Sequence, residues 1–194
     1  MRGRRLVVLA VVAVLVVLTV ITVSAAPALA QAHGGDLWAG LEGGVGLPQG
    51  DAKAAYREGW FGTVFLLAPI LSGPSAGLSI RAEGHGLLSM AKEFEGVSGE
   101  ARIYTYGGAI EVHFQAGAVR PFLVGGAGNY TFRLTTKYGA YEETEQQNCF
   151  GWSAGGGIAA DVGRVTLFVE ARYHRASFSR APFVFVPVTI GIAF

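Results

Sequence analysis

The side chains of this sequence that could carry out covalent chemistry are few. His174 precedes two serines, Ser177 and Ser179, and an imidazole near a hydroxyl is the pair that nucleophilic catalysis uses. Such a pair also needs an acid that orients the imidazole. No Asp or Glu follows His174 in the sequence. We therefore expect no catalytic residue in this region.

Two other histidines and the cysteine add no second site. His85 and His113 fall toward opposite ends of their predicted strands, so neither a triad nor a zinc site is expected to assemble from them. We interpret each as a polar residue of the interior of the fold. Cys149 is the only cysteine, which excludes an internal disulfide and a cysteine-based metal site. The sequence therefore predicts no enzyme, no metal and no cofactor.

Several charged residues lie two positions apart, a spacing that would let them form ion pairs inside the fold. Glu170 and Arg172 share one face of a predicted strand, and Arg81 with Glu83 repeats this arrangement on another strand. Acids and bases on such faces can pair with each other when they are buried. The predicted charge network consists of Glu42, Arg81, Glu83, Glu111, Arg133, Glu170 and Arg172.

The elements that must position these charges are β-strands. Apolar residues alternate with small or polar ones, and a period of two is typical of a strand with one apolar face. The clearest example is the end of the chain, where Val184, Val186, Val188, Ile190, Ile192 and Phe194 alternate with mostly small residues. The predicted strands are Leu37–Gly46, Trp60–Ala68, Ala76–Leu88, Arg102–Phe114, Phe122–Leu134, Phe150–Asp161, Val165–His174 and Phe183–Phe194.

The first 30 residues have the features of an export signal. Three arginines precede an uncharged apolar run, Leu6–Val23, and Ala28-Leu29-Ala30 follows as a small-x-small site. This order predicts a signal peptide over residues 1–30, cleaved after Ala30; the alternative is a transmembrane anchor. The leader contains three of the fifteen Lys and Arg, so residues 31–194 carry twelve against fourteen Asp and Glu. This near-neutral balance gives no basis for a nucleic-acid partner.

Strand lengths and connections predict one domain over residues 31–194. Strands of about 9–13 residues match the length that a tilted strand needs to cross a membrane. Short links, 69–75, 115–121 and 162–164, alternate with longer ones, 47–59, 89–101 and 135–149, an asymmetry typical of outer-membrane barrels. We expect no helix in this part. The aromatic residues expected to face lipid are Trp60, Tyr104, Phe122, Tyr130, Phe132, Trp152 and Tyr173; the alternative is a soluble, lipocalin-like barrel with its apolar face inside.

Several segments resemble the OmpA/OmpX-like "porin family" of eight-stranded outer-membrane barrels. They are Pro121–Tyr130, Gly155–Ile158, Glu170–Tyr173 and Ile190–Phe194. The resemblance implies an all-β, antiparallel up-and-down transmembrane barrel in the bacterial outer membrane. It also implies a monomer in contact with outer-membrane lipids and lipopolysaccharide. In that family the assembly machinery reads the last strand, here through Ile190, Ile192 and Phe194.

An eight-stranded barrel is only wide enough for side chains to fill. We therefore expect the charge network to close the lumen, and the protein to have a structural or surface-interaction role. The alternatives are a narrow channel and a lipid-modifying enzyme that resembles the lipid A acylhydrolases. Those enzymes carry a His-x-Ser pair, but Ala176 stands at that position after His174. Glu142, Glu143 and Glu145 are expected in a solvated loop, or else bound to divalent cations that bridge lipopolysaccharide.

Overall fold

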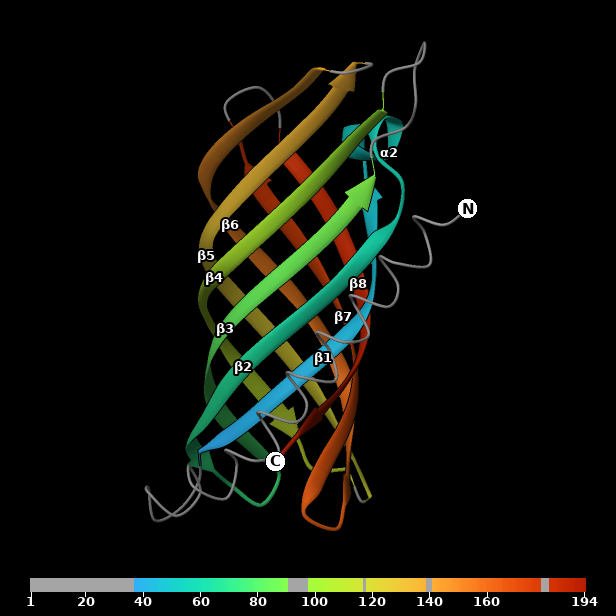
Figure 1. Cartoon of the computed structure of the whole chain (residues 1–194). Helices are drawn as coiled ribbons and strands as arrows, with labels where there is room; N and C mark the ends of the chain where they lie inside the picture. Colours follow the sequence, from blue (N-terminus) through green and yellow to red (C-terminus); the bar gives the residue numbers. More distant parts are fainter. Residues whose placement is uncertain (1–36, 91–97, 117, 139–140, 179–181) are drawn as a thin grey trace.

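Eight strands form a closed barrel in the computed structural model, which describes residues 37–90, 98–116, 118–138, 141–178 and 182–194 (Figure 1). The predicted signal peptide lies outside the described residues. The strands are β1 (Trp38–Gln49), β2 (Gly59–Ser72), β3 (Ala76–Met90), β4 (Ser98–Phe114), β5 (Val119–Tyr138), β6 (Tyr141–Val162), β7 (Val165–Ser177) and β8 (Pro182–Ala193).

Every strand pairs antiparallel with its sequence neighbours, and β1 pairs with β8 to close the ring. The closing seam continues to the last residue of the chain, because Ala39 and Phe194 exchange two backbone hydrogen bonds of 2.9 Å. Closure pairs both edges of each strand within the ring, which is the condition for strands to cross a membrane, whereas the extension of β6 over residues 141–150 pairs with β5 alone. The predicted fold class, an eight-stranded antiparallel up-and-down barrel, is confirmed.

Most strands extend a few residues into the predicted links, and two connections differ more strongly from the prediction. The link expected over 135–149 is largely strand, since β5 runs to Tyr138 and β6 starts at Tyr141. In addition, a five-residue helix, α2 (Asp51–Ala55), lies between β1 and β2, where no helix was expected. The run Asp-Ala-Lys-Ala-Ala consists mostly of good helix formers. It is too short to show the 3.6-residue period on which the prediction depended.

The outer face of the barrel is apolar. Large hydrophobic side chains are exposed on every strand, for example Tyr106 on β4, Phe150 on β6 and Ile190 on β8, which are 66%, 71% and 67% exposed. A continuous belt of this kind marks a surface that contacts lipid, so the lipocalin-like alternative is wrong. Among the described residues, no helix is long and apolar enough to span a membrane.

The expected lipid-facing aromatic belt needs a correction at β5. Trp60, Tyr104 and Trp152 are exposed, and Tyr173 packs against Trp152 with ring centroids 5.4 Å apart. Phe122, Tyr130 and Phe132 instead point inward; the first two are buried, and Phe132 packs on the core. The larger residues of β5 predict the wrong lipid face for this strand. Aromatic rings also fill both ends of the lumen, so size alone does not identify the lipid side.

The interior has three layers. Above the middle, toward α2, Phe61, Tyr130 and Phe185 belong to one buried apolar cluster. Below the middle, toward the C-terminus, Phe65, Phe122 and Phe168 belong to a second cluster. Between the two clusters lie buried charged and polar side chains: Glu42, Thr63, Ser79, Arg81, Glu83, Glu170, Arg172 and Thr189.

Candidate functional site in the barrel interior

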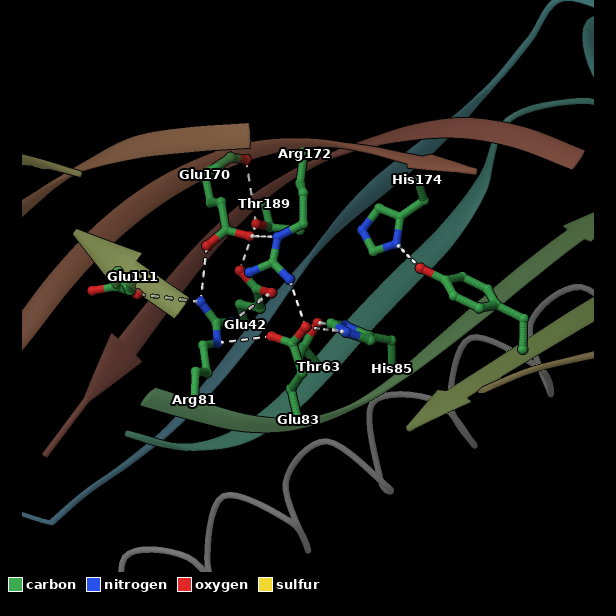
Figure 2. Close-up of polar contacts among 11 residues, drawn as sticks. Glu42, Thr63, Arg81, Glu83, His85, Glu111, Glu170, Arg172, His174 and Thr189 are labelled. Atoms are coloured by element: carbon green, nitrogen blue, oxygen red, sulfur yellow. Dashed lines mark hydrogen bonds and ion pairs between the residues drawn. The ribbon is translucent and has the colours of Figure 1, made fainter. Parts of the chain in front are cut away.

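Arg81 of β3 is the centre of the middle layer, with its side chain only 1% exposed. Its guanidinium donates to Glu170 Oε2 at 2.9 Å and to Glu42 Oε1 at 3.2 Å. Its Nε lies 3.1 Å from Glu83 Oε2, and Glu111 Oε2 is more distant at 3.7 Å. Figure 2 shows these carboxylates converging on the one guanidinium from β1, β3, β4 and β7.

Arg172 of β7 makes the second set of contacts. Its Nη1 donates to Glu83 Oε1 at 2.6 Å, and its Nε lies 2.8 Å from Glu170 Oε1 (Figure 2). Glu83 and Glu170 therefore each bind both arginines. Thr189 of β8 donates to the remaining oxygen, Glu42 Oε2, at 2.7 Å.

The two-residue spacing of Arg81 with Glu83 and of Glu170 with Arg172 produces this arrangement. β3 and β7 lie on opposite sides of the eight-stranded ring, and residues two apart on a strand share a face. The acid of one strand therefore meets the base of the other across the lumen. Charges this deeply buried are tolerated only when they are paired. Arg81 also stacks over the ring of Phe65, 3.8 Å from its centroid, as cations do on aromatic faces.

The structure brings together six of the seven predicted network residues. Glu42, Arg81, Glu83, Glu111, Glu170 and Arg172 form one connected set of ion pairs. Arg133 does not belong to it, so its placement in the lumen was wrong. It is exposed and lies on the opposite face of β5 from Tyr130 and Phe132. The error has the same origin as the inverted face of β5.

A histidine pair next to the network was not foreseen. His85 and His174 lie with ring centroids 5.4 Å apart. His85 Nε2 is 3.1 Å from Glu83 Oε1, and its Nδ1 is 2.9 Å from the Thr63 hydroxyl. His174 Nδ1 is 2.9 Å from the Tyr130 hydroxyl. The spacing in the sequence could have predicted the pair. Each histidine is two residues from a network charge on its own strand, and residues two apart on a strand share a face.

The order Thr63, His85, Glu83 is that of a nucleophile, a base and an orienting acid. Thr63 is 4% exposed, however, and His85 and Glu83 are each 8% exposed. The Thr63 hydroxyl therefore lies inside the barrel, away from the outer surface. His113 lies apart from this group, in the lower part of the lumen near Gly77. In the described part of the chain, no group of three or more His, Cys, Asp or Glu could hold a metal.

Below the network the lumen is open. A cavity of about 290 Å³ lies between the network and the turns, lined among others by Trp38, Phe65, His113, Arg120 and Phe168. Arg120 donates to Asp161 at 2.6 Å and to the Thr166 hydroxyl at 3.2 Å. Side chains do not fill this half of the barrel completely. The network lies between this half and the upper half.

The upper rim holds an aromatic pocket of about 270 Å³. Its walls include Tyr56, Phe132, Phe178 and Phe183, and α2 closes one side. Tyr56 contacts the rings of Phe132 and Phe183 at 6.1 and 5.3 Å. Burial raises the pKa of the Tyr56 hydroxyl, and the Glu145 carboxylate raises it further. The pocket therefore presents mainly apolar side chains, together with the carboxylates of Asp51 and Glu145, at the loop end of the barrel.

The residues of the predicted assembly signal lie on the closing strand. Ile190 is exposed on the outer face of β8, and Ile192 is half-buried. Phe194 follows β8 and pairs with Ala39 in the seam. Their reading by an assembly machinery stays a prediction.

No protein-family model matches the chain, and no curated protein matches it. Solved structures do. Neisserial surface protein A (NspA) is 14% identical, with a TM-score of 0.61 over 81% of this chain and 95% of that one. A major outer membrane protein of Thermus thermophilus is 13% identical, with a TM-score of 0.54 over 82% and 99%. Ail, the attachment invasion locus protein of Yersinia pestis, is 12% identical, with a TM-score of 0.50 over 82% and 100%.

At these identities the likeness concerns the fold. The closed ring of eight strands, its apolar outer belt and these structural neighbours together define the class. The chain is an eight-stranded β-barrel of the bacterial outer-membrane type.

Proposed function

We propose that the protein is a closed outer-membrane barrel with a structural or surface-interaction role rather than a diffusion pore. The observation that carries this proposal is the network in which Arg81 and Arg172 both bind Glu83 and Glu170. Two of these contacts, Arg81–Glu170 and Arg172–Glu83, join opposite walls of the lumen at its middle. A solute that crossed the barrel would have to break them.

A layer of packed aromatic rings also closes the lumen. On the α2 side of the network, Phe61, Tyr130 and Phe185 are at most 5% exposed. His174 stacks on Phe185 with ring centroids 4.7 Å apart. Opening a path therefore requires both the loss of buried ion pairs and the movement of packed rings.

The different ends of the barrel indicate how it is oriented in the membrane. The short turns and the C-terminus lie at one end, and α2 lies at the other (Figure 1). Short turns face the periplasm in outer-membrane barrels. The extensions of β5 and β6 and the aromatic pocket would then lie at the extracellular end of the barrel. Loops on a rigid scaffold commonly carry binding interactions. The apolar belt contacts outer-membrane lipids and lipopolysaccharide, and the assembly machinery reads the last strand.

A release assay tests the closure. The refolded protein is inserted into liposomes loaded with a small fluorescent dye, and insertion is verified by heat-modifiable gel mobility. We expect dye retention equal to that of protein-free liposomes. Release that scales with the amount of folded protein would refute the closed barrel.

The contacts of Thr63, His85 and Glu83 favour one second candidate, a lipid-modifying enzyme. It requires Thr63 to become accessible, although its hydroxyl is buried. Mass spectrometry of lipid A acyl chains, after incubation with the folded protein, separates the two functions. We expect an unchanged acyl composition. A loss of acyl chains that disappears in Thr63→Val would establish the enzyme instead.

A further inference from the structure

A basic groove lies on the outer wall of the barrel, across β4, β5 and β6. It has a volume of about 490 Å³ and is lined by Gly99, Glu100, Arg102, Arg133, Thr135, Lys137, Glu142 and Thr144. The strand register places these side chains on one outward face, because Glu100 pairs with Thr135 and Thr135 pairs with Thr144. The groove is separate from the lumen and from the ion-pair network.

Two arginines in this groove stand directly opposite each other. Arg102 of β4 and Arg133 of β5 are partners in the register, and both are exposed on the same face. Like charges in this position repel each other and destabilise the strand pair. An anion bound between them would turn this repulsion into attraction. The Glu100 carboxylate already pairs with Arg102, so an added anion would mainly serve Arg133.

The other charged side chains of the groove form two ion pairs. Arg102 pairs with Glu100, and Lys137 Nζ lies 3.4 Å from Glu142 Oε2. Among the described residues, Arg133 makes no ion pair, although it lies between these two. The hydroxyls of Thr135 and Thr144 are 3.3 Å apart at the same site. A guanidinium fork beside hydroxyl donors suits the oxygens of a phosphate group.

The height of the groove identifies the source of the phosphate. Arg102 lies between Tyr104 and the start of β4 at Ser98, toward the loop end of the barrel. Tyr104 and Tyr106 follow Arg102 on the outward face and are 47% and 66% exposed. Exposed aromatic rings of this kind gather at the boundary between the apolar layer and the headgroups. The groove therefore lies next to the headgroups of the surrounding lipid.

We propose that Arg133, flanked by Arg102 and Lys137, binds a phosphate on the headgroup of a membrane glycolipid, as in lipid A. This proposal rests on the proposed function, since it takes the loop end of the barrel to lie in the outer leaflet. It adds a specific lipid site to a wall that would otherwise offer only apolar contact. The two acids of the groove keep it from being a general anion-binding surface.

Native mass spectrometry of the folded protein in a maltoside detergent tests the site. The probes are bisphosphorylated lipid A, dephosphorylated lipid A and inorganic phosphate, each added alone. We expect bisphosphorylated lipid A to bind, and Arg133→Gln to weaken it about tenfold, as expected when one charge-assisted contact is lost. Arg133→Lys should retain part of the affinity. Arg175→Gln is the matched control, because Arg175 is exposed on the same outer wall but lies outside the groove.

Thermal unfolding supplies a second readout. Without lipid, Arg133→Gln should unfold at the same temperature as wild type or higher, because the opposed charges are relieved. With lipid A, wild type should gain more stability than the variant. Equal binding by wild type and Arg133→Gln, or equal binding of dephosphorylated lipid A, would overturn the proposal. Binding of inorganic phosphate with the same dependence on Arg133 would overturn the assignment to a lipid headgroup. Dye retention reports on the closed lumen independently of all these outcomes.

Discussion

Arg172 shows how the residues of the lumen depend on each other. It is 1% exposed and binds Glu83 and Glu170 at 2.6 and 2.8 Å. Taken alone, any of these groups would be an uncompensated charge in a low-dielectric space. Each charged group is therefore tolerated in the lumen because its partners are present.

Arg172→Met should therefore destabilise the folded barrel by about 3–5 kcal/mol, the loss that follows when one partner of a buried pair is removed. The double variant Arg172→Met/Glu83→Leu should lose less than the sum of the two single variants. Urea unfolding in detergent gives the four free energies of the double-mutant cycle. Additive losses would show that the two residues are not coupled.

An exposed pair in the same protein provides the control for this cycle. Arg120 and Asp161 are 2.6 Å apart, but their side chains are 27% and 55% exposed. Water screens such a pair, so its coupling should be no more than about 1 kcal/mol. A coupling as large as that of Arg172 with Glu83 would mean that burial is not the source of the difference.

At the scale of the element, β7 shows most clearly how alternation divides lipid from lumen. Leu167 and Val169 are 44% and 50% exposed, whereas Thr166 and Glu170 are 7% and 4% exposed. Val169→Arg should destabilise the barrel by about 2–4 kcal/mol if it lies near the bilayer midplane, and by less near an interface. The measurement is urea unfolding in lipid vesicles, with Thr166→Ser as a conservative lumen control.

Labelling checks the same register without unfolding the protein. A lipid-phase thiol probe should react with cysteine at Leu167 and not with cysteine at Thr166. The opposite result would mean that the strand is shifted by one residue, because such a shift exchanges the two faces. Cys149 is replaced by Ser in both variants, since it is the only native thiol.

The closing strand supports a prediction about insertion. Phe194 donates to and accepts from the backbone of Ala39, and the last strand is the predicted assembly signal. Deleting Phe194, or replacing it with Asp, should lower the amount of folded protein in the outer membrane. Heat-modifiable mobility of isolated outer membranes measures this amount. Wild-type levels of the deletion variant would refute the signal.

Much of this element-scale arrangement could be predicted from the sequence, and the failures have physical causes. Period-two alternation identified eight strands and placed Arg81, Glu83, Glu170 and Arg172 on inward faces. It failed on β5, because the large apolar residues Phe122 and Tyr130 fill the lumen while small ones face outward. Arg133 was misplaced with them.

Other features depend on contacts that a one-dimensional pattern does not contain. The helix α2 is shorter than two turns, and its Ala52 is buried in the upper apolar cluster. The pairing of His85 with His174 depends on how β3 and β7 approach across the lumen. The strand extensions around 135–149 are polar and exposed, so they have the composition of a loop. Their strand structure comes from pairing with each other.

At the scale of the whole molecule, the barrel has one closed middle and two different ends. The lower end has a cavity lined by Trp38, Phe65 and Phe168, and the upper end has an aromatic pocket beside α2. The ion pairs between β3 and β7 separate the two. This arrangement supports the proposed closed barrel, because a channel requires a continuous path through the lumen.

Single-channel recording in planar bilayers tests this account most directly. Purified protein, shown to be folded by heat-modifiable mobility, is added to a membrane under an applied voltage. We predict insertion without stepwise currents, because the pairs of Arg81 and Arg172 with Glu83 and Glu170 remain closed. Reproducible conductance steps from the folded wild-type protein, absent from heat-denatured samples, would contradict a closed lumen and show a hydrated path through the network.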